Sequence, residues 1–256
     1  MESSQAAAFI RESITRQVSN QDSITAYREP IIGFLSAHDP GFQDLDSHVG
    51  FDHYLPGDLL PGARSIACFY LPFSPNIVDA NQSHKALVAR EWAVAYQETN
   101  RLIGQITSRL IDELGALGIR AAAEPATGNF DEADLKSRWS HKSMAVMAGI
   151  GSFGLHQLVI TDAGCTGRIG SFVVDIDLPF EKPPGKERCE YFATGACLDC
   201  VLACPVDALG EDKQFDRRAC WAQCLKNGDD FRDLGDEVHM CGKCAVMGPC
   251  ALESAV

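Results

Sequence analysis

Cysteine is concentrated at one end of this chain. Nine of its eleven cysteines lie between Cys189 and Cys250, including the run CLDCVLACP at residues 197–205 and the pair CGKC at 241–244. In such a run, two thiolates one short turn apart bind neighbouring irons of a cubane cluster, and a third follows three or four residues later. The proline then ends the loop because it fixes φ and has no backbone N–H. This spacing indicates an iron-sulfur protein that transfers electrons.

Zinc and disulfide bonds are the two alternatives for these cysteines. Zinc ribbons usually separate their cysteine pairs by about 15 to 20 residues, whereas 40 residues lie between Cys200 and Cys241. A disulfide framework needs an oxidising compartment, and the N-terminal residues MESSQ lack the basic and apolar regions of a secretory signal. We therefore favour iron-sulfur clusters, and reduced thiols in this number predict a cytoplasmic protein.

The cysteines are numerous enough for two 4Fe-4S clusters. In two-cluster ferredoxins each cysteine of the Cys-Pro type binds the other cluster, and this interleaved pattern predicts two ligand sets. The first set is Cys189, Cys197, Cys200 and Cys250, and the second set is Cys204, Cys220, Cys241 and Cys244. Thr194 stands where a ferredoxin has a cysteine. Cys224 follows Cys220 by one helical turn and is either its replacement or a small buried hydrophobe.

Charge and hydropathy limit the partners of the chain. With 35 acidic and 22 basic residues, the formal charge is −13, and a 4Fe-4S unit with four thiolates adds about −2. Such a protein repels phosphate backbones except at a local basic patch, for which residues 136–142 are the main candidate. No apolar stretch approaches the roughly 20 residues of a membrane helix. Neither a nucleic-acid partner nor a membrane span is therefore expected.

The first 180 residues mix helices and strands. Apolar periodicity predicts helices at 5–18, 87–115 and 140–149, and strands at 65–71, 119–123, 158–161 and 171–176. Residues 20–60 and 126–137 are interpreted as polar connections, and the Pro/Lys-rich segment 179–186 as a linker. This order predicts an α+β protein with two domains, 1–180 and 181–256. Cys68 and Cys165 lie outside the cysteine-rich module and are expected to be structural.

A glycine loop follows the helix expected at 140–149. Gly149, Gly151 and Gly154 have the spacing of the dinucleotide fingerprint, but that fingerprint requires a strand before the loop and a helix after it. Here a predicted helix precedes the loop and a predicted strand follows it. The glycines either let the backbone approach a flat or bulky ligand, or form a tight helix-to-strand connection without a ligand.

Three segments carry a resemblance to a known family. They are LLPGARSI at residues 59–66, MAGIGSFG at 147–154 followed by LVI at 158–160, and the cysteine run at 197–205 with its second cysteine group. In this order they resemble the epoxyqueuosine reductase family and its relatives, which include the reductive dehalogenases. The resemblance implies a nitroreductase-like α/β domain that binds a corrinoid, joined to a ferredoxin-like domain with two 4Fe-4S clusters.

The same resemblance implies an electron path and a set of site residues. In the family, electrons pass from an outer cluster to an inner cluster and on to cobalamin, which reduces the substrate. Glu124 occupies the place of the family's catalytic aspartate, and a carboxylic acid in a desolvated pocket has a raised pKa that suits proton donation. His141 is a second candidate proton donor. The candidates for holding the cofactor are Ser140, Lys142, Gly149, Gly151, Gly154 and Arg168.

The chain departs from the family pattern at several positions. Leu155 and His156 follow the glycine loop where the family has a lysine, and an insertion separates Glu124 from that loop. The last cysteine group ends in MGPC at residues 247–250 rather than in Cys-Pro. These departures and the acidic charge argue for a divergent member of the family and against a tRNA substrate.

Three functions agree with these features. The first is a cytoplasmic iron-sulfur oxidoreductase that passes electrons through two clusters to a cofactor, cobalamin or a flavin, in the N-terminal domain. Its partners would be an electron donor such as ferredoxin or flavodoxin and a small-molecule or corrinoid-linked substrate. The second is a non-catalytic, ferredoxin-like donor that reduces the corrinoid of a partner protein. The third is a zinc-stabilised interaction protein.

Overall fold

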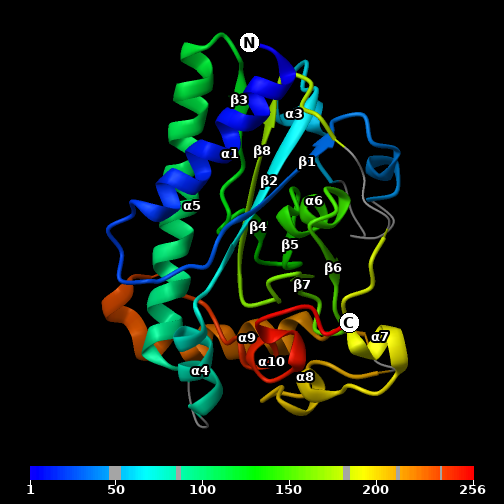
Figure 1. Ribbon diagram of the computed structural model, residues 1–256. Helices are drawn as coiled ribbons and strands as arrows, with labels where there is room; N and C mark the ends of the chain where they lie inside the picture. Colours follow the sequence, from blue (N-terminus) through cyan, green and yellow to red (C-terminus); the bar gives the residue numbers. More distant parts are fainter. Residues whose placement is uncertain (46–52, 85–87, 181–184, 212–213, 237) are drawn as a thin grey trace.

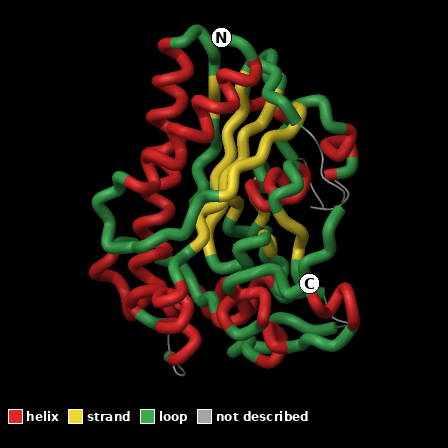
Figure 2. Tube along the Cα trace, in the orientation of Figure 1, coloured by secondary structure: helices red, strands yellow, loops and turns green. Residues whose placement is uncertain are grey.

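The protein is built from mixed helices and strands, which confirms the α+β class (Figures 1 and 2). The computed structural model describes residues 1–45, 53–84, 88–180, 185–211, 214–236 and 238–256. Its main sheet has the strand order β1-β2-β8-β3, with antiparallel neighbours. The strands are β1 (Ile31–Ser36), β2 (Ser65–Pro72), β8 (Gly167–Val174) and β3 (Ala121–Ala122). Across the described residues, no helix combines the length and the apolar character needed to cross a membrane.

The sheet is covered on both faces, because its central strand is apolar on both sides. All eight residues of β2 are buried. On one face Phe69 lies in a core with α1 (Ser3–Ser19) and α5 (Arg90–Ala116). On the other face Tyr70 lies in a core with α6 (His141–Met147). A strand buried on both faces has a continuous apolar sequence rather than an alternating one.

Most of the elements expected from the apolar pattern are present with shifted ends. The expected helices are α1, α5 and α6; residue 87, the expected start of the second helix, lies outside the described residues. The strands expected at 65–71, 158–161 and 171–176 are β2, β7 (Val159–Thr161) and β8, and the one expected at 119–123 is reduced to β3. Residues 20–60 were wrongly expected to be only connections, since they include β1, η1 (Pro40–Gln43) and α3 (Pro56–Leu59). Likewise, residues 126–137 contain the hairpin of β4 (Phe130–Asp131) and β5 (Lys136–Ser137).

The cysteine-rich module lies at one end of the sheet, beside α4 (Pro75–Ser83) and the start of α5 (Figure 1). Its elements are α7 (Glu190–Thr194), α8 (Asp199–Leu202), α9 (Arg217–Gly228), η2 (Asp229–Leu234), α10 (Lys243–Val246) and η3 (Pro249–Ala251). One apolar cluster contains residues of both parts, among them Trp92 of α5 and Val246 of α10. Residues 181–184 of the expected linker lie outside the described residues. The module and the sheet therefore share a core.

The last residues of the chain return to the sheet. The backbone N–H of Cys165 donates a hydrogen bond to the carbonyl of Cys250 at 2.9 Å. The guanidinium of Arg28 donates to the carbonyls of Leu252 at 2.7 Å and Ala163 at 2.6 Å. These bonds fix Cys250 beside the connection between β7 and β8.

Candidate functional site

The four cysteines of the first predicted ligand set line one small cavity. Cys189 precedes α7, Cys197 precedes α8, Cys200 lies in α8 and Cys250 lies in η3. Three of them are buried and Cys197 is half-buried. Burial raises the pKa of Cys200 to about 12, so a metal that binds there must displace a proton. Thiols that converge from several short elements meet the ligand requirement of a cubane cluster.

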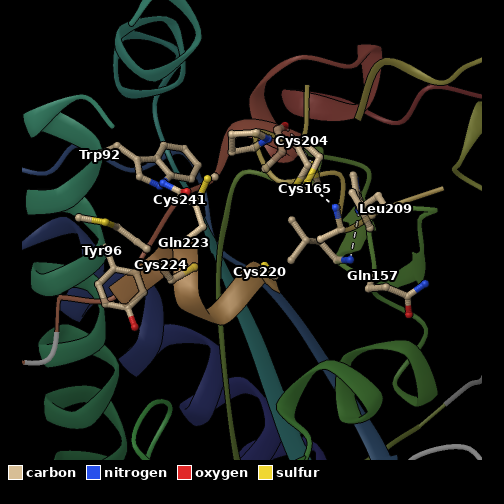
Figure 3. A pocket seen from close by; sticks show the side chains of 18 of the residues that line it. Trp92, Tyr96, Gln157, Cys165, Cys204, Leu209, Cys220, Gln223, Cys224 and Cys241 are labelled. Atoms are coloured by element: carbon tan, nitrogen blue, oxygen red, sulfur yellow. Dashed lines mark hydrogen bonds between the residues drawn. The ribbon is translucent and has the colours of Figure 1, made fainter. Parts of the chain in front are cut away.

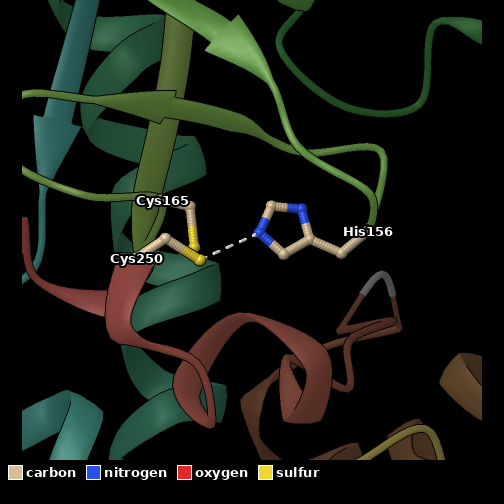
Figure 4. Close-up of side chains that lie close together, drawn as sticks. All are labelled: His156, Cys165 and Cys250. Atoms are coloured by element: carbon tan, nitrogen blue, oxygen red, sulfur yellow. Dashed lines mark hydrogen bonds between the residues drawn. The ribbon is translucent and has the colours of Figure 1, made fainter. Parts of the chain in front are cut away.

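Two further side chains lie against Cys250. Nε2 of His156 is 3.5 Å from Sγ of Cys250, and the ligand atoms of His156, Cys165 and Cys250 all lie within 4.8 Å of one another (Figure 4). Hydrogen bonds from Cys165 and from His156 lower the pKa of Cys250, while the pairing raises the pKa of Cys165. The thiol of Cys165, expected to be structural, thus lies beside a candidate ligand. The sequence marked His156 only as a departure from the family's glycine loop, and it gave no sign that Cys165 lies near a ligand set.

The second predicted ligand set lines a larger cavity of about 280 Å³. Its cysteines are Cys204, Cys220, Cys241 and Cys244, and Cys224 and Cys165 line the same cavity. Figure 3 labels all of these except Cys244. Trp92 of α5 and Leu209 also line this cavity. Apolar side chains reduce the access of water to the sulfurs, which is one of the factors that set a cluster's reduction potential. The number of thiols and the space between them fit a 4Fe-4S cluster.

Cys220 and Cys224 compete for one ligand position of this cavity. They lie one turn apart on α9. A hydrogen bond between them lowers the pKa of Cys220 and raises the pKa of Cys224, and the nearby Lys142 also lowers the pKa of Cys220. The two thiols therefore share one proton, and the thiolate of the pair is the form that binds metal.

A cleft lined by apolar and cationic side chains adjoins the larger cysteine cavity. It consists of two cavities, of about 590 Å³ and about 320 Å³, that share lining residues with the cysteine cavity. Lys142 lines all three. The larger part of the cleft reaches Arg217 and Trp221 of α9, and the smaller part reaches Tyr70 and Arg168 of the sheet. Volumes of several hundred Å³ at a junction between structural units are typical of cofactor and substrate sites.

Ser140 and His141, two of the predicted site residues, line the smaller part of the cleft at the start of α6. Oγ of Ser140 caps the helix by accepting a hydrogen bond from the N–H of Ser143 at 3.1 Å. Nδ1 of His141 pairs with Oγ of Ser171 at 2.7 Å, and Nε2 pairs with the carbonyl of Pro125 at 3.1 Å. Burial lowers the pKa of His141 to about 4. Its ring is therefore neutral and held by the protein, so the geometry gives no support to His141 as a proton donor.

Lys142 and Arg168 are the predicted site residues whose charges belong to the cleft. Nζ of Lys142 donates to the carbonyl of Gln157 at 3.0 Å. Desolvation by the surrounding protein lowers the pKa of Lys142, and the nearby Cys220 acts in the opposite direction. The guanidinium carbon of Arg168 lies 4.4 Å from the centre of the Tyr96 ring, and burial lowers the pKa of Arg168. Both cations are available to a negatively charged ligand.

Glu124 and the three glycines are not among the residues that line these cavities. Glu124 follows β3 and is half-buried. Gly149, with φ of 75°, ends α6. A Cβ at Gly151 would lie 2.3 Å from a side chain of β7, and one at Gly154 would lie 2.7 Å from the ring of His156. The glycines thus allow the tight connection into the pair of β6 (Gly151–Phe153) and β7. Their role in holding a cofactor stays a prediction.

The sequence is similar to curated epoxyqueuosine reductases. It is 25% identical to that of Vibrio cholerae over 242 residues, which cover 84% of this chain and 60% of the relative. It is 25% identical to that of Escherichia coli (strain K12) over 245 residues, which cover 91% of this chain and 61% of the relative. The chain thus spans about 60% of the length of these curated relatives. No family model matches the sequence.

Solved structures share the fold at lower sequence identity. An epoxyqueuosine reductase solved with an epoxyqueuosine-modified stem loop of tRNA-Tyr has a TM-score of 0.61 and 20% identity, covering 96% of this chain and 66% of its own. A catabolic reductive dehalogenase in complex with 3-bromo-4-hydroxybenzoic acid has a TM-score of 0.59 and 14% identity, covering 88% of this chain and 30% of its own. These likenesses concern the fold.

Proposed function

We propose that this chain, a member of the epoxyqueuosine reductase-like family, is an iron-sulfur oxidoreductase in which two 4Fe-4S clusters deliver electrons to a corrinoid. One observation carries the proposal: the two sets of four cysteines line two separate cavities, and the larger of these adjoins a cleft. A reductase needs such an arrangement, because the cluster next to the cofactor must lie close to it while the other cluster remains near a donor.

We propose two domains, one that contains the sheet and one that contains the cysteines. Residues 1–180 would form a nitroreductase-like domain, supported by the antiparallel sheet with α1 and α5 on one face and α6 on the other. Residues 181–256 would form a ferredoxin-like domain with two clusters, supported by the short helices that carry the cysteines. The number of reduced thiols and the family support a cytoplasmic location.

The residues of the chain suggest an order for the two clusters. When bound, the clusters supply one-electron transfer and the corrinoid supplies a reducing cobalt. The second cysteine set would hold the inner cluster, because its cavity shares Lys142 and Arg168 with the cleft. The first set would hold the outer cluster. Its elements α7 and α8 expose Phe192 and Leu202 to solvent, where a ferredoxin or flavodoxin would dock.

Anaerobically purified protein is expected to contain about eight irons per chain. Cys220→Ser is expected to lose about half of this iron, whereas Cys224→Ser, one turn away, is expected to keep it, because Cys220 belongs to the proposed ligand set and Cys224 is its hydrogen-bond partner. Iron and acid-labile sulfide analysis of the two variants measures the difference.

Two results of that analysis would contradict the assignment. If Cys220→Ser keeps the wild-type iron content and Cys224→Ser loses iron, Cys224 is the ligand and Cys220 is its hydrogen-bond partner. Zinc in place of iron in the wild-type protein would replace the whole proposal with that of a zinc-stabilised interaction protein.

A tRNA substrate is a second candidate, because one structural neighbour was solved with a tRNA stem loop. The stem loop in that structure argues against the expectation, drawn from the acidic charge of this chain, that nucleic acid is not a substrate. Lys136 and Arg217 line the larger part of the cleft and offer a local basic surface, although the formal charge is −13. Fluorescence anisotropy of a labelled tRNA-Tyr stem loop separates the candidates: saturable binding at physiological salt favours the tRNA, and no binding by cluster-loaded protein favours a small substrate.

A further inference from the structure

His156 lies between the two cysteine cavities. It lines the larger cavity, together with Cys165 and Cys244, and it also lines the smaller cavity, together with Cys250. Only 4% of the residue is exposed. Figure 4 shows its ring pointing at the sulfur of Cys250. The ring is therefore shielded from water and placed to act on a cluster ligand.

A tight turn between β6 and β7 aims this ring. The N–H of Gln157 donates to the carbonyl of Gly154 at 2.9 Å, and the N–H of Gly154 donates to the carbonyl of Leu158 at 2.9 Å. A Cβ at Gly154 would lie 2.7 Å from Cε1 of His156. Since such a distance is shorter than any ordinary contact between carbon atoms, the ring occupies space that a side chain at position 154 would otherwise fill.

The partner of Nδ1 determines which ring nitrogen of His156 carries the proton. The backbone N–H of Leu158 donates to Nδ1 at 3.1 Å. A ring nitrogen that accepts a hydrogen bond carries no proton, so the proton of the neutral imidazole is on Nε2. Nε2 is the atom that faces Sγ of Cys250, 3.5 Å away. Turning the ring over would place carbon atoms at both positions and lose both hydrogen bonds.

The same hydrogen bond argues against His156 as an iron ligand. A histidine that binds a metal through one ring nitrogen carries its proton on the other nitrogen and donates from it. Here Nδ1 accepts from the backbone of Leu158 instead, so Nε2 has no free lone pair for a metal. The smaller cavity is also lined by the four cysteines of the first ligand set, which already complete the ligands of a cubane cluster.

We propose that His156 donates an N–H···S hydrogen bond to Cys250 and thereby raises the reduction potential of the outer cluster. This inference rests on the proposed function and specifies how its electron path is tuned. Reduction adds negative charge to the cluster and its sulfurs, and a hydrogen bond strengthens as its acceptor becomes more negative, so the bond favours the reduced state. The outer cluster then accepts electrons from a weaker reductant than the same four thiolates would without His156.

A redox titration of anaerobically purified, cluster-loaded protein, followed by EPR, tests the proposal. The signal that Cys200→Ser loses identifies the outer cluster. His156→Leu, which removes the donor, is expected to lower the ratio of reduced to oxidised outer cluster at a fixed potential about threefold to tenfold, or about 30–60 mV for one electron. The inner cluster is expected to titrate as in wild type.

Two further variants isolate the hydrogen bond. His156→Gln carries an amide N–H near the place of Nε2 and is expected to restore part of the shift. His38→Leu removes an exposed histidine that follows β1, and as the matched control it is expected to titrate like wild type. A measurement on the wild type needs no substitution: with histidine labelled by heavy nitrogen, pulsed EPR of the reduced outer cluster is expected to show a weak nitrogen coupling through the hydrogen bond.

Three outcomes would overturn the proposal. The first is that His156→Leu keeps its iron and titrates like wild type. The second is that His156→Leu and His156→Gln shift the potential equally, which would assign the effect to packing or water access rather than to the N–H donor. The third is a wild-type nitrogen coupling that is absent, or as strong as that of a nitrogen bonded to iron. Failure of the proposed function would appear separately, as missing iron or missing corrinoid binding in the wild type.

Discussion

Serine in place of Cys200 is expected to remove about half of the iron bound by the protein, about four of eight atoms, and to destabilise the cysteine-rich module. Cys200 lies in α8 and lines the cavity of the first ligand set. A cubane cluster held by three thiolates and a serine is poorly retained, and metal binding contributes directly to the folding of such a module. Iron analysis and the EPR spectrum of the reduced protein measure the loss.

Cys68→Ser is the matched control for this experiment. Cys68 is fully buried in the core between β2 and α6, away from both cavities. Serine at this site costs stability because its hydroxyl loses water on burial, but the iron content is expected to stay at the wild-type value. Unchanged iron in Cys200→Ser would refute the ligand assignment, and lost iron in Cys68→Ser would refute the structural role of that cysteine.

Gly242→Ala is expected to weaken the packing of the cysteine-rich module against α5. Gly242 has φ of 74°, and a Cβ there would lie 2.3 Å from the indole of Trp92. The left-handed backbone costs about 1–2 kcal/mol for alanine, and the clash inside a packed core adds about 1–3 kcal/mol. A combined cost of about 3 kcal/mol lowers the melting temperature by about 6–12 °C for a chain of this size. Iron is expected to leave the second cluster first, because Cys241 is the neighbouring residue.

Gly195→Ala isolates the backbone part of this effect. Gly195 has a similar φ of 77°, but a Cβ there would meet no atom within 4 Å. This variant therefore bears only the backbone cost, about 1–2 kcal/mol, and is expected to retain its iron. Equal melting temperatures for the two variants would show that the contact between Gly242 and Trp92 does not hold the module in place.

The sequence was informative where apolar periodicity alone decides the structure. The continuous apolar run at 65–71 is β2, buried on both faces. The strand β1 was missed because Gly33 interrupts a short apolar segment within a polar stretch. The structure supplies the reason for that glycine: a Cβ would lie 2.5 Å from Ile150. Such a close approach between distant segments leaves no periodic signal in the sequence.

The candidate site was only partly accessible from the sequence. Cysteine spacing sorted the thiols into two sets, and each set lines one cavity. Arg168 was proposed from its position near the glycine loop, but its partner Tyr96 comes from α5, which is distant in the sequence. The roles proposed for His141 and the glycines came from proximity to the same loop. In the structure, both ring nitrogens of His141 form hydrogen bonds within the protein. Gly151 and Gly154 lie close to neighbouring side chains.

The EPR spectrum of cob(II)alamin, recorded with and without anaerobically purified protein, shows whether this chain itself holds the corrinoid that its clusters reduce. A change to a base-off signal is expected on addition of the protein. A cob(II)alamin spectrum that is unchanged by an excess of protein with full iron content would contradict it, and would favour a ferredoxin-like donor for a corrinoid bound elsewhere.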